Sequence, residues 1–237
     1  GAKRYGVLGV PSRSTVRARQ LLLDVAYEVL DAVMLVTEPF AVGYGMQACT
    51  RAVVVDIGAG TIDICPLQGA LPADDDQVTV AYGGDYVDED FCQRMLAAYP
   101  EARMSLNMAR ALKEKHGFVG AARQPVTVQL PVKGCPPQEF DITEPLTRAC
   151  ESMVAEIVRG IHELVWKLDP EMQETLLGNI VVSGGGSRLK GIERALETAL
   201  ADYGRVSVSR VSDSEFAGAT GALRLALGMP GEHWHRL

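Results

Sequence analysis

The sequence lacks any apolar run of the roughly 20 residues that a membrane-spanning helix needs, because charged residues or glycines interrupt every long apolar stretch. It has only five cysteines, far apart and without a C-x-x-C pair, which predicts neither a disulfide framework nor a zinc site and agrees with a reducing cytoplasm. Long runs of one charge are also missing, and without a concentrated basic face nucleic acid is not an expected partner. The sequence begins at Gly1 without an initiating Met, so we expect a fragment of a longer protein.

Apolar residues are abundant. They make up 47% of the 237 residues, enough for the core of one large domain or of two small lobes. The 30 acidic and 23 basic side chains give a net charge of -7 and are scattered along the chain. We therefore expect a soluble, cytoplasmic protein.

Two strand-helix units are predicted at the start of the chain. Residues 6–10 and 33–36 are predicted strands, and Ser12 and Ser14 are candidate caps for the helix between them. The apolar spacing of this helix predicts one buried stripe, made of Leu21, Leu22, Val25, Ala26 and Val29. A second helix is predicted over residues 40–46. Two such units in succession predict a mostly parallel sheet with helices on its faces.

The rest of the chain mixes strands and helices. An antiparallel edge is predicted from strands at residues 52–55, 62–67 and 78–82. A smaller inserted lobe is predicted from helices at 85–99 and 107–115 and strands at 126–130 and 138–142. The remaining predicted elements are helices at 143–168, 169–177, 191–203 and 216–227 and strands at 179–183 and 206–208.

The octet D-I-G-A-G-T-I-D, residues 56–63, lies between two of these strands. Gly58 and Gly60 let backbone N–H groups approach a phosphate closely, and the Thr61 hydroxyl is a further donor. Asp56, at the end of a buried strand, can hold a metal-bound water, since Mg²⁺ prefers carboxylates and retained waters. The alternative is an ordinary hairpin turn that contains glycine.

A second glycine motif, S-G-G-G-S-R at residues 183–188, follows a predicted strand and precedes a helix. Consecutive glycines cost backbone entropy, so they indicate the close approach of a ligand or of another backbone. A strand-to-helix turn also directs free N–H groups at anions. A tight structural turn remains the alternative, but two glycine loops can close on one nucleotide from different sides.

Three further acidic and basic residues are candidates for chemistry. Glu38 ends a strand immediately before Pro39 and could orient an attacking water, or could simply favour the positive end of the following helix. Lys113 and Glu114 could reach a ribose or a base from their helix, although such a pair is usually a solvated helix face.

These motifs together resemble the actin, Hsp70 and sugar kinase superfamily, and within it the bacterial actins. The octet is similar to the family's second phosphate motif, and residues 183–188 are similar to its adenosine motif. G-G-D-Y-V-D at 83–88 resembles the start of the upper lobe, and A-L-K-E-K at 111–115 matches the lysine and glutamate that flank the base. The alanine in the phosphate loop and the runs E-P-F-A-V-G-Y-G, K-E-K-H-G-F-V-G-A and N-I-V-V-S-G-G-G-S-R-L-K-G are similar to magnetosome filament actins of the MamK type.

The resemblance implies an α/β, actin-like (ribonuclease H-like) ATPase fold, with a mixed sheet, flanking helices, a smaller inserted α+β lobe and an incomplete first lobe. The implied domains are the remainder of the first large lobe (1–50), a second, nucleotide-binding large lobe (51–82 and 143–217), the inserted small lobe (83–142) and a C-terminal helix and tail (218–237). It also implies filaments of the protein itself that organise magnetosome chains, with a full-length paralogue and a magnetosome scaffold protein as further partners.

The same resemblance assigns roles within the site. Glu38 positions water and Asp56 holds Mg²⁺ through water. The residues implied to bind ATP or ADP are Gly58, Ala59, Gly60, Thr61, Asp63, Gly84, Asp85, Lys113, Glu114, Gly184, Gly185, Gly186 and Ser187.

One departure concerns the family's first phosphate hairpin, D-x-G-T, which the 237 residues do not contain. Hydrolysis of ATP by this chain alone therefore stays open. The alternative is a truncated, non-hydrolysing actin-like protein that binds a full-length filament or a scaffold. A small-molecule kinase on the same fold is a further alternative, although no acceptor-site signature supports it.

Overall fold

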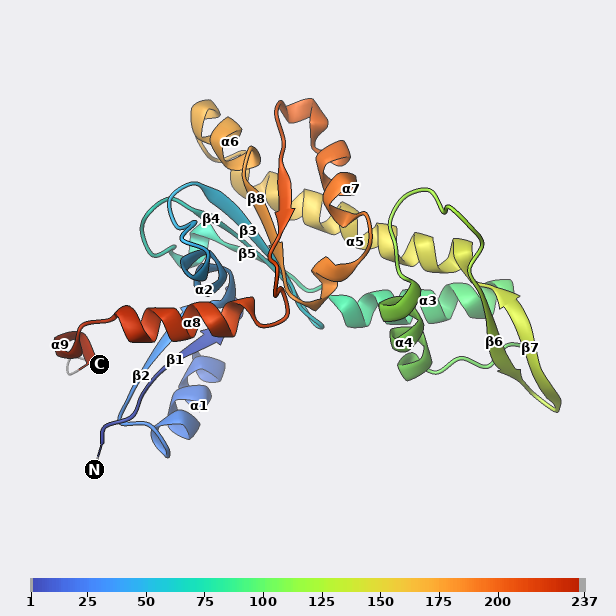
Figure 1. The fold of residues 1–237 in the computed structure, drawn as a ribbon, viewed down its shortest axis with the longest axis horizontal. Coiled ribbons are helices and arrows are strands. Elements are labelled where there is room, and N and C mark those ends of the chain that lie inside the picture. The colour runs from blue at the N-terminus through green and yellow to red at the C-terminus, as the bar shows by residue number, and fades with distance from the viewer. Residues whose placement is uncertain (1, 235–237) are drawn as a thin grey trace.

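The computed structural model describes residues 2–234, with a five-stranded mixed sheet at its centre (Figure 1). The strands lie in the order β5 (Val78–Val80), β4 (Ile62–Leu67), β3 (Ala52–Ile57), β8 (Ile180–Ser183) and β9 (Val208–Arg210). β5, β4 and β3 pair antiparallel, whereas β3, β8 and β9 pair parallel. The predicted antiparallel edge is therefore confirmed.

Two smaller sheets flank this centre. β1 (Tyr5–Val10) and β2 (Ala32–Thr37) form a parallel pair, joined by α1 (Val16–Tyr27). β6 (Thr127–Val132) and β7 (Cys135–Asp141) form an antiparallel hairpin near α3 (Gly84–Ala98) and α4 (Leu106–His116), away from β1 and β2 in Figure 1. The predicted parallel pairing of the first two strands is confirmed, but it produces a sheet of its own.

The remaining helices pack on the central sheet, on one another or, for the last of them, beside β1, where Trp234 stacks on Tyr5. They are α2 (Glu38–Gly45), α5 (Thr143–Val165), α6 (Pro170–Leu177), α7 (Ile192–Ala199), α8 (Ala217–Gly228) and α9 (Gly231–Trp234). None of the helices among residues 2–234 is long and apolar enough to cross a membrane. The last three residues of the predicted C-terminal tail, 235–237, lie outside the described residues.

The alternation of side chains along β3 creates two hydrophobic cores, one on each face of the sheet. Val53 and Val55 belong to the core that contains Ile157 of α5, whereas Val54 belongs to the core that contains Phe40 of α2. A strand buried on both faces requires a continuous apolar run, which β3 supplies.

The first predicted helix differs from expectation in two ways. Its cap is Thr15, whose side chain accepts a hydrogen bond from the Ala18 amide at 3.2 Å, because Ser12 and Ser14 still belong to the turn after β1. The predicted buried stripe is confirmed only in part: Ala26 is buried and Leu22 is half-buried, but Leu21, Val25 and Val29 are 65%, 56% and 55% exposed. The helix lies against a two-stranded sheet, which is too narrow to cover a full helix face.

The last strand also differs from the prediction, which placed it at residues 206–208. β9 instead pairs Val208 with Ile180 and continues to Arg210. Its limits follow from backbone hydrogen bonds to β8 at the edge of the sheet, and these bonds do not depend on apolar side chains.

Candidate functional site

The first glycine motif forms the tight turn of the β3–β4 hairpin. The Gly58 amide closes the turn by donating to the Thr61 carbonyl at 2.9 Å. The start of α3 lies directly against it: the Gly84 amide donates to the Gly58 carbonyl at 3.0 Å. A Cβ on Gly83 would lie 2.3 Å from the Ala59 carbonyl oxygen, so only glycine fits there. The turn and the start of α3 therefore form one continuous backbone surface.

The second glycine motif follows β8, which runs parallel to β3. Both turns therefore lie at the carboxyl ends of these two neighbouring strands. Gly184 has a φ of +77°, and a Cβ there would lie 2.4 Å from the Ile57 carbonyl oxygen. A Cβ on Gly186 would lie 2.2 Å from the Cγ2 atom of Ile57, whereas a Cβ on Gly185 would meet nothing within 4 Å. The outer two glycines allow the two turns to pack together, and Gly185 faces open space.

The two turns line one cavity of about 270 Å³, close to the lower end of the ~300–1,000 Å³ that is usual for small-molecule sites. Gly58 and Ala59 contribute from the first turn, and Gly185 and Gly186 contribute from the second. The other lining residues are Gly84, Asp85, Val87, Arg110, Lys113, Glu114, Gly117, Met153, Arg188, Leu189, Lys190 and Glu215.

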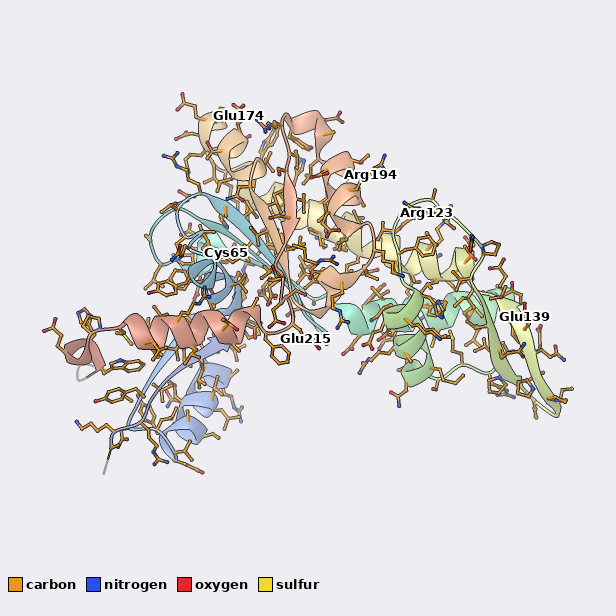
Figure 2. All side chains as sticks on the ribbon, viewed as in Figure 1. Cys65, Arg123, Glu139, Glu174, Arg194 and Glu215 are labelled. Atoms are coloured by element: carbon orange, nitrogen blue, oxygen red, sulfur yellow. The ribbon has the colours of Figure 1, made fainter. Side chains whose placement is uncertain are left out.

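The cavity wall has a polar part made of backbone, a charged part and an apolar part. Val87, Met153 and Leu189 supply the apolar surface. Glu215, which lies beside the start of α8 in Figure 2, pairs with Arg188 at 3.3 Å. An apolar slot next to charged groups and an exposed backbone turn suits a ligand with a flat apolar ring, a polar middle and an anionic end.

Two carboxylates, Glu38 and Asp56, lie on elements next to the first turn. Glu38 is the first residue of α2, and Asp56 lies on β3, where it accepts a hydrogen bond from the Ser183 hydroxyl at 2.7 Å. Burial, and after it the charges of Asp56 and Asp63, raise the pKa of Glu38 from 4.5 to about 7. Burial also raises the pKa of Asp56, although its bond from Ser183 opposes the change. Glu38 can therefore exchange a proton near neutral pH.

Asp63 connects the central sheet to the turn after β1. Its buried carboxylate accepts hydrogen bonds from the Ser12 amide at 2.8 Å, the Thr79 hydroxyl at 2.6 Å and the Thr61 hydroxyl at 3.0 Å. The last of these bonds uses the Thr61 hydroxyl, which the sequence predicts as a donor to phosphate. These bonds stabilise the hairpin through Asp63 and Thr61, and the binding of nucleotide by these two residues stays a prediction.

The carboxylates also allow a test of the fit for Mg²⁺. Among residues 2–234, no group of three or more His, Cys, Asp or Glu side chains is arranged to bind a metal directly. Asp56 is paired on one oxygen by a protein donor. This arrangement fits an ion that keeps its waters and touches the carboxylate through one of them, as Mg²⁺ commonly does.

Lys113 is not part of a solvated helix face. Its Nζ atom lies 2.7 Å from the Asp88 carboxylate and donates to the Gly84 carbonyl at 2.6 Å. Its side chain is only 12% exposed. The cation thus joins α4 to the first turn of α3, at the edge of the cavity.

Comparison with known proteins agrees with this geometry. The family model described as MreB/Mbl protein matches residues 2–228. The chain belongs to the MreB/Mbl family. Its expected actin-like fold is confirmed by relatives in that family whose structures are known.

Among curated MreB/Mbl relatives, "Actin-like protein MamK" of Paramagnetospirillum magneticum (strain ATCC 700264 / AMB-1) is 41% identical over 231 residues. The match covers 98% of this chain but 66% of the relative, so the chain spans just under two thirds of that protein.

Solved structures give the same result. A "MamK double helical filament" has a TM-score of 0.93 at 41% identity, covering 96% of this chain and 70% of that one. A non-polymerising MamK mutant bound to AMPPNP has a TM-score of 0.82 at 41% identity, covering 94% and 68%. This chain is thus similar to MamK in sequence and in structure.

Within this MreB/Mbl fold, the cavity includes part of the set of residues that sequence reasoning selected. The predicted ligand-binding residues in its wall are Gly58, Ala59, Gly84, Asp85, Lys113, Glu114, Gly185 and Gly186. The other selected residues, which are not among the lining residues, are Glu38, Asp56, Gly60, Thr61, Asp63, Gly184 and Ser187. Ser187 is buried and donates its hydroxyl to the Gly184 carbonyl at 2.8 Å, which stabilises the second turn.

Sequence reasoning did not select four charged residues of the cavity wall: Arg110, Arg188, Lys190 and Glu215. Arg110 could have been found, because it lies three residues before Lys113 and therefore on the same side of the helix. Glu215 carried no local signal, since it reaches the cavity only through the position of the turn before α8.

Proposed function

We propose that this chain is the nucleotide-binding part of an actin-like ATPase that forms filaments and, like its MamK relatives, serves the organisation of magnetosomes. The observation that carries the proposal is that both glycine turns line one cavity, with Lys113 and Glu114 of α4 also in its wall. Such a cavity accommodates phosphates at one end and a nucleoside at the other. The relative whose structure holds AMPPNP supports this choice of ligand.

We propose the following arrangement of ATP or ADP. The turn at Gly58 and Ala59, with Gly84 and Asp85 beside it, faces the phosphates, because Gly58 and Gly84 carry no side chain and allow a ligand to approach the backbone closely. The second turn, at Gly185 and Gly186, faces the nucleoside from the other side.

The acidic residues have separate roles in this proposal. Glu38, whose pKa of about 7 lets it accept a proton at neutral pH, orients the attacking water. Asp56 holds a magnesium ion through water. Bound magnesium neutralises phosphate charge and so favours phosphoryl transfer. Asp63 supports the site from behind through its bonds to Thr61 and Ser12.

The partner in this proposal is a second copy of the protein in a filament, located in the cytoplasm; a paralogue and a magnetosome scaffold protein are further proposed partners. We also propose that residues 83–142 form the inserted lobe and that residues 51–82 and 143–217 form the nucleotide-binding lobe. Nucleotide that touches both lobes favours the relative position of the lobes that binds it more tightly. This difference in affinity couples nucleotide binding to filament assembly.

Sedimentation with and without ATP and Mg²⁺ tests the proposal. We expect polymer to appear only with nucleotide, and Glu38→Gln to reduce phosphate release while ATP still binds. Phosphate release that is unchanged in the Glu38 variant would refute the role of Glu38, and absence of both ATP binding and polymer would refute the proposed function.

One alternative is a non-hydrolysing protein that binds an existing filament or a scaffold. Calorimetric titration with ATP separates the two. Micromolar binding of ATP supports the proposed function. Co-sedimentation with a MamK filament, combined with no measurable ATP binding, supports the alternative.

A further inference from the structure

Asp88, the last residue of the G-G-D-Y-V-D motif, is a buried carboxylate to which neither the proposed chemistry nor that resemblance assigns a role in binding. It lies on α3, its side chain is 2% exposed, and it is not among the residues that line the cavity. Burial of a charge is costly unless partners compensate it. Asp88 has two such partners, and both belong to α4: Lys113 Nζ at 2.7 Å and Arg110 Nε at 3.2 Å.

Both partners of Asp88 are themselves residues of the cavity wall. Arg110 also pairs with Asp85 at 2.6 Å, and Lys113 also donates to the Gly84 carbonyl at 2.6 Å. Asp88 is the group that compensates both cations, so it holds α4 on the first two turns of α3.

The contact between α4 and α3 that Asp88 makes through Lys113 and Arg110 determines the width of the cavity. One wall is fixed, because Gly84 is bonded to the first glycine turn and the second turn packs on the central sheet. Another part of the wall is the segment of α4 that carries Glu114, next to Lys113. The position of α4 therefore decides how far Glu114 lies from the second turn, whereas the first turn keeps its shape without α4.

We propose that Asp88 is a positioning residue for the nucleoside end of the cavity: through Lys113 and Arg110 it fixes α4, and with it Glu114, at the distance from Gly185 that one nucleoside fits. The inference rests on the proposed function, because it concerns the same cavity. It separates two parts of that cavity, since the Gly58–Ala59 turn at the phosphate end is held by its own backbone bonds, and Asp88 reaches that end only through Lys113 at the Gly84 carbonyl and Arg110 at Asp85.

The test is Asp88→Asn, which keeps the shape of the side chain and removes its charge. The measurements are calorimetric titrations of the purified protein with Mg-ATP and with Mg-tripolyphosphate, which has phosphates but no nucleoside. We expect ATP affinity to fall about tenfold or more, because one partner of a buried ion pair is lost, and tripolyphosphate affinity to change less than about twofold. Asp88→Glu keeps the charge, and we expect it to recover most of the ATP affinity.

Asp90→Asn is the matched control. Asp90 lies on the same helix and pairs with Arg94 at 2.9 Å, but neither residue lines the cavity. We expect this variant to bind both ligands as the unaltered protein does.

Hydrogen exchange of the protein without ligand supplies a second measurement that does not depend on nucleotide binding. We expect Asp88→Asn to speed amide exchange in α4 while β3 and β8 stay protected, and Asp90→Asn to leave α4 unchanged. The inference is overturned if Asp88→Asn binds ATP normally, if it loses ATP and tripolyphosphate affinity equally, or if α4 exchange does not change. If the unaltered protein binds no ATP, the proposed function fails. The hydrogen-exchange data still test whether Asp88 holds α4, because they are measured without nucleotide.

Discussion

Replacing Glu38 by Gln is predicted to stabilise the protein at high pH. Burial and the neighbouring charges of Asp56 and Asp63 raise the pKa of Glu38 from 4.5 to about 7. A carboxyl group whose pKa is raised on folding binds its proton more tightly in the folded state, so folding is penalised once the pH is high enough to ionise it. The cost is small below about pH 4.5, grows between about pH 4.5 and 7, and is complete above pH 7.

The structure sets the magnitude of this effect. At about 1.4 kcal/mol for each pKa unit, the change from 4.5 to about 7 gives an upper bound of about 3 kcal/mol. Glu38 is only partly buried, so water screens its charge, and about 1–2 kcal/mol is the better expectation. Glutamine keeps the size of the side chain and carries no charge, so Glu38→Gln removes this cost.

Urea unfolding at pH 5 and pH 8.5 measures the effect. The gain in unfolding free energy caused by Glu38→Gln should be larger at pH 8.5 by about 1–2 kcal/mol. Glu28→Gln, at the exposed end of α1, is the control and should show no such difference. An equal effect of Glu38→Gln at both pH values would refute the reasoning, because it would mean that Glu38 does not titrate differently on folding.

Two further predictions concern packing and thiols. Gly221→Ala should lower the unfolding free energy by about 2 kcal/mol or more in urea titrations, because its Cβ would lie 1.8 Å from the Ala41 carbonyl oxygen, where α8 crosses α2. Gly218→Ala, on the same helix, would meet no atom nearer than 4.0 Å and should be nearly neutral, so similar losses in both variants would contradict this account. In thiol labelling at pH 8, exposed Cys135 should react first, whereas Cys65, whose pKa burial raises to about 12, should react only on unfolding. Mass spectrometry of the labelled peptides reads this order, and early labelling of Cys65 would contradict the burial.

Much of the fold could be predicted because the signals were local. The run A-V-V-V at 52–55 and the glycine turn after it specify the β3–β4 hairpin without help from the rest of the chain. Helix α5 was predicted to start at Thr143, where it does, since its apolar residues recur with helical spacing. The prediction failed for part of the buried face of α1, because the width of the sheet beside that helix is not encoded in the helix itself.

The candidate site, like the fold, has parts that could be predicted from the sequence and parts that could not. Both glycine motifs were identified as backbone turns without side chains, and the structure shows them side by side at one end of neighbouring parallel strands. The functions of individual glycines were not predictable: Gly184 is needed for its approach to Ile57, whereas Gly185 faces the cavity. The ligand roles of Glu38, Asp56 and the other selected residues stay predictions.

The sequence by itself determined the turns, the helix periods and the apolar strands, because each depends on residues within a few positions of one another. Only the tertiary structure decided which charges meet. The Asp88–Lys113 pair joins residues on two helices, and Asp63 reaches Ser12 across 51 positions of the chain. Such contacts depend on how whole elements pack, and packing sets distance and burial, which fix the partners and the pKa of a carboxylate.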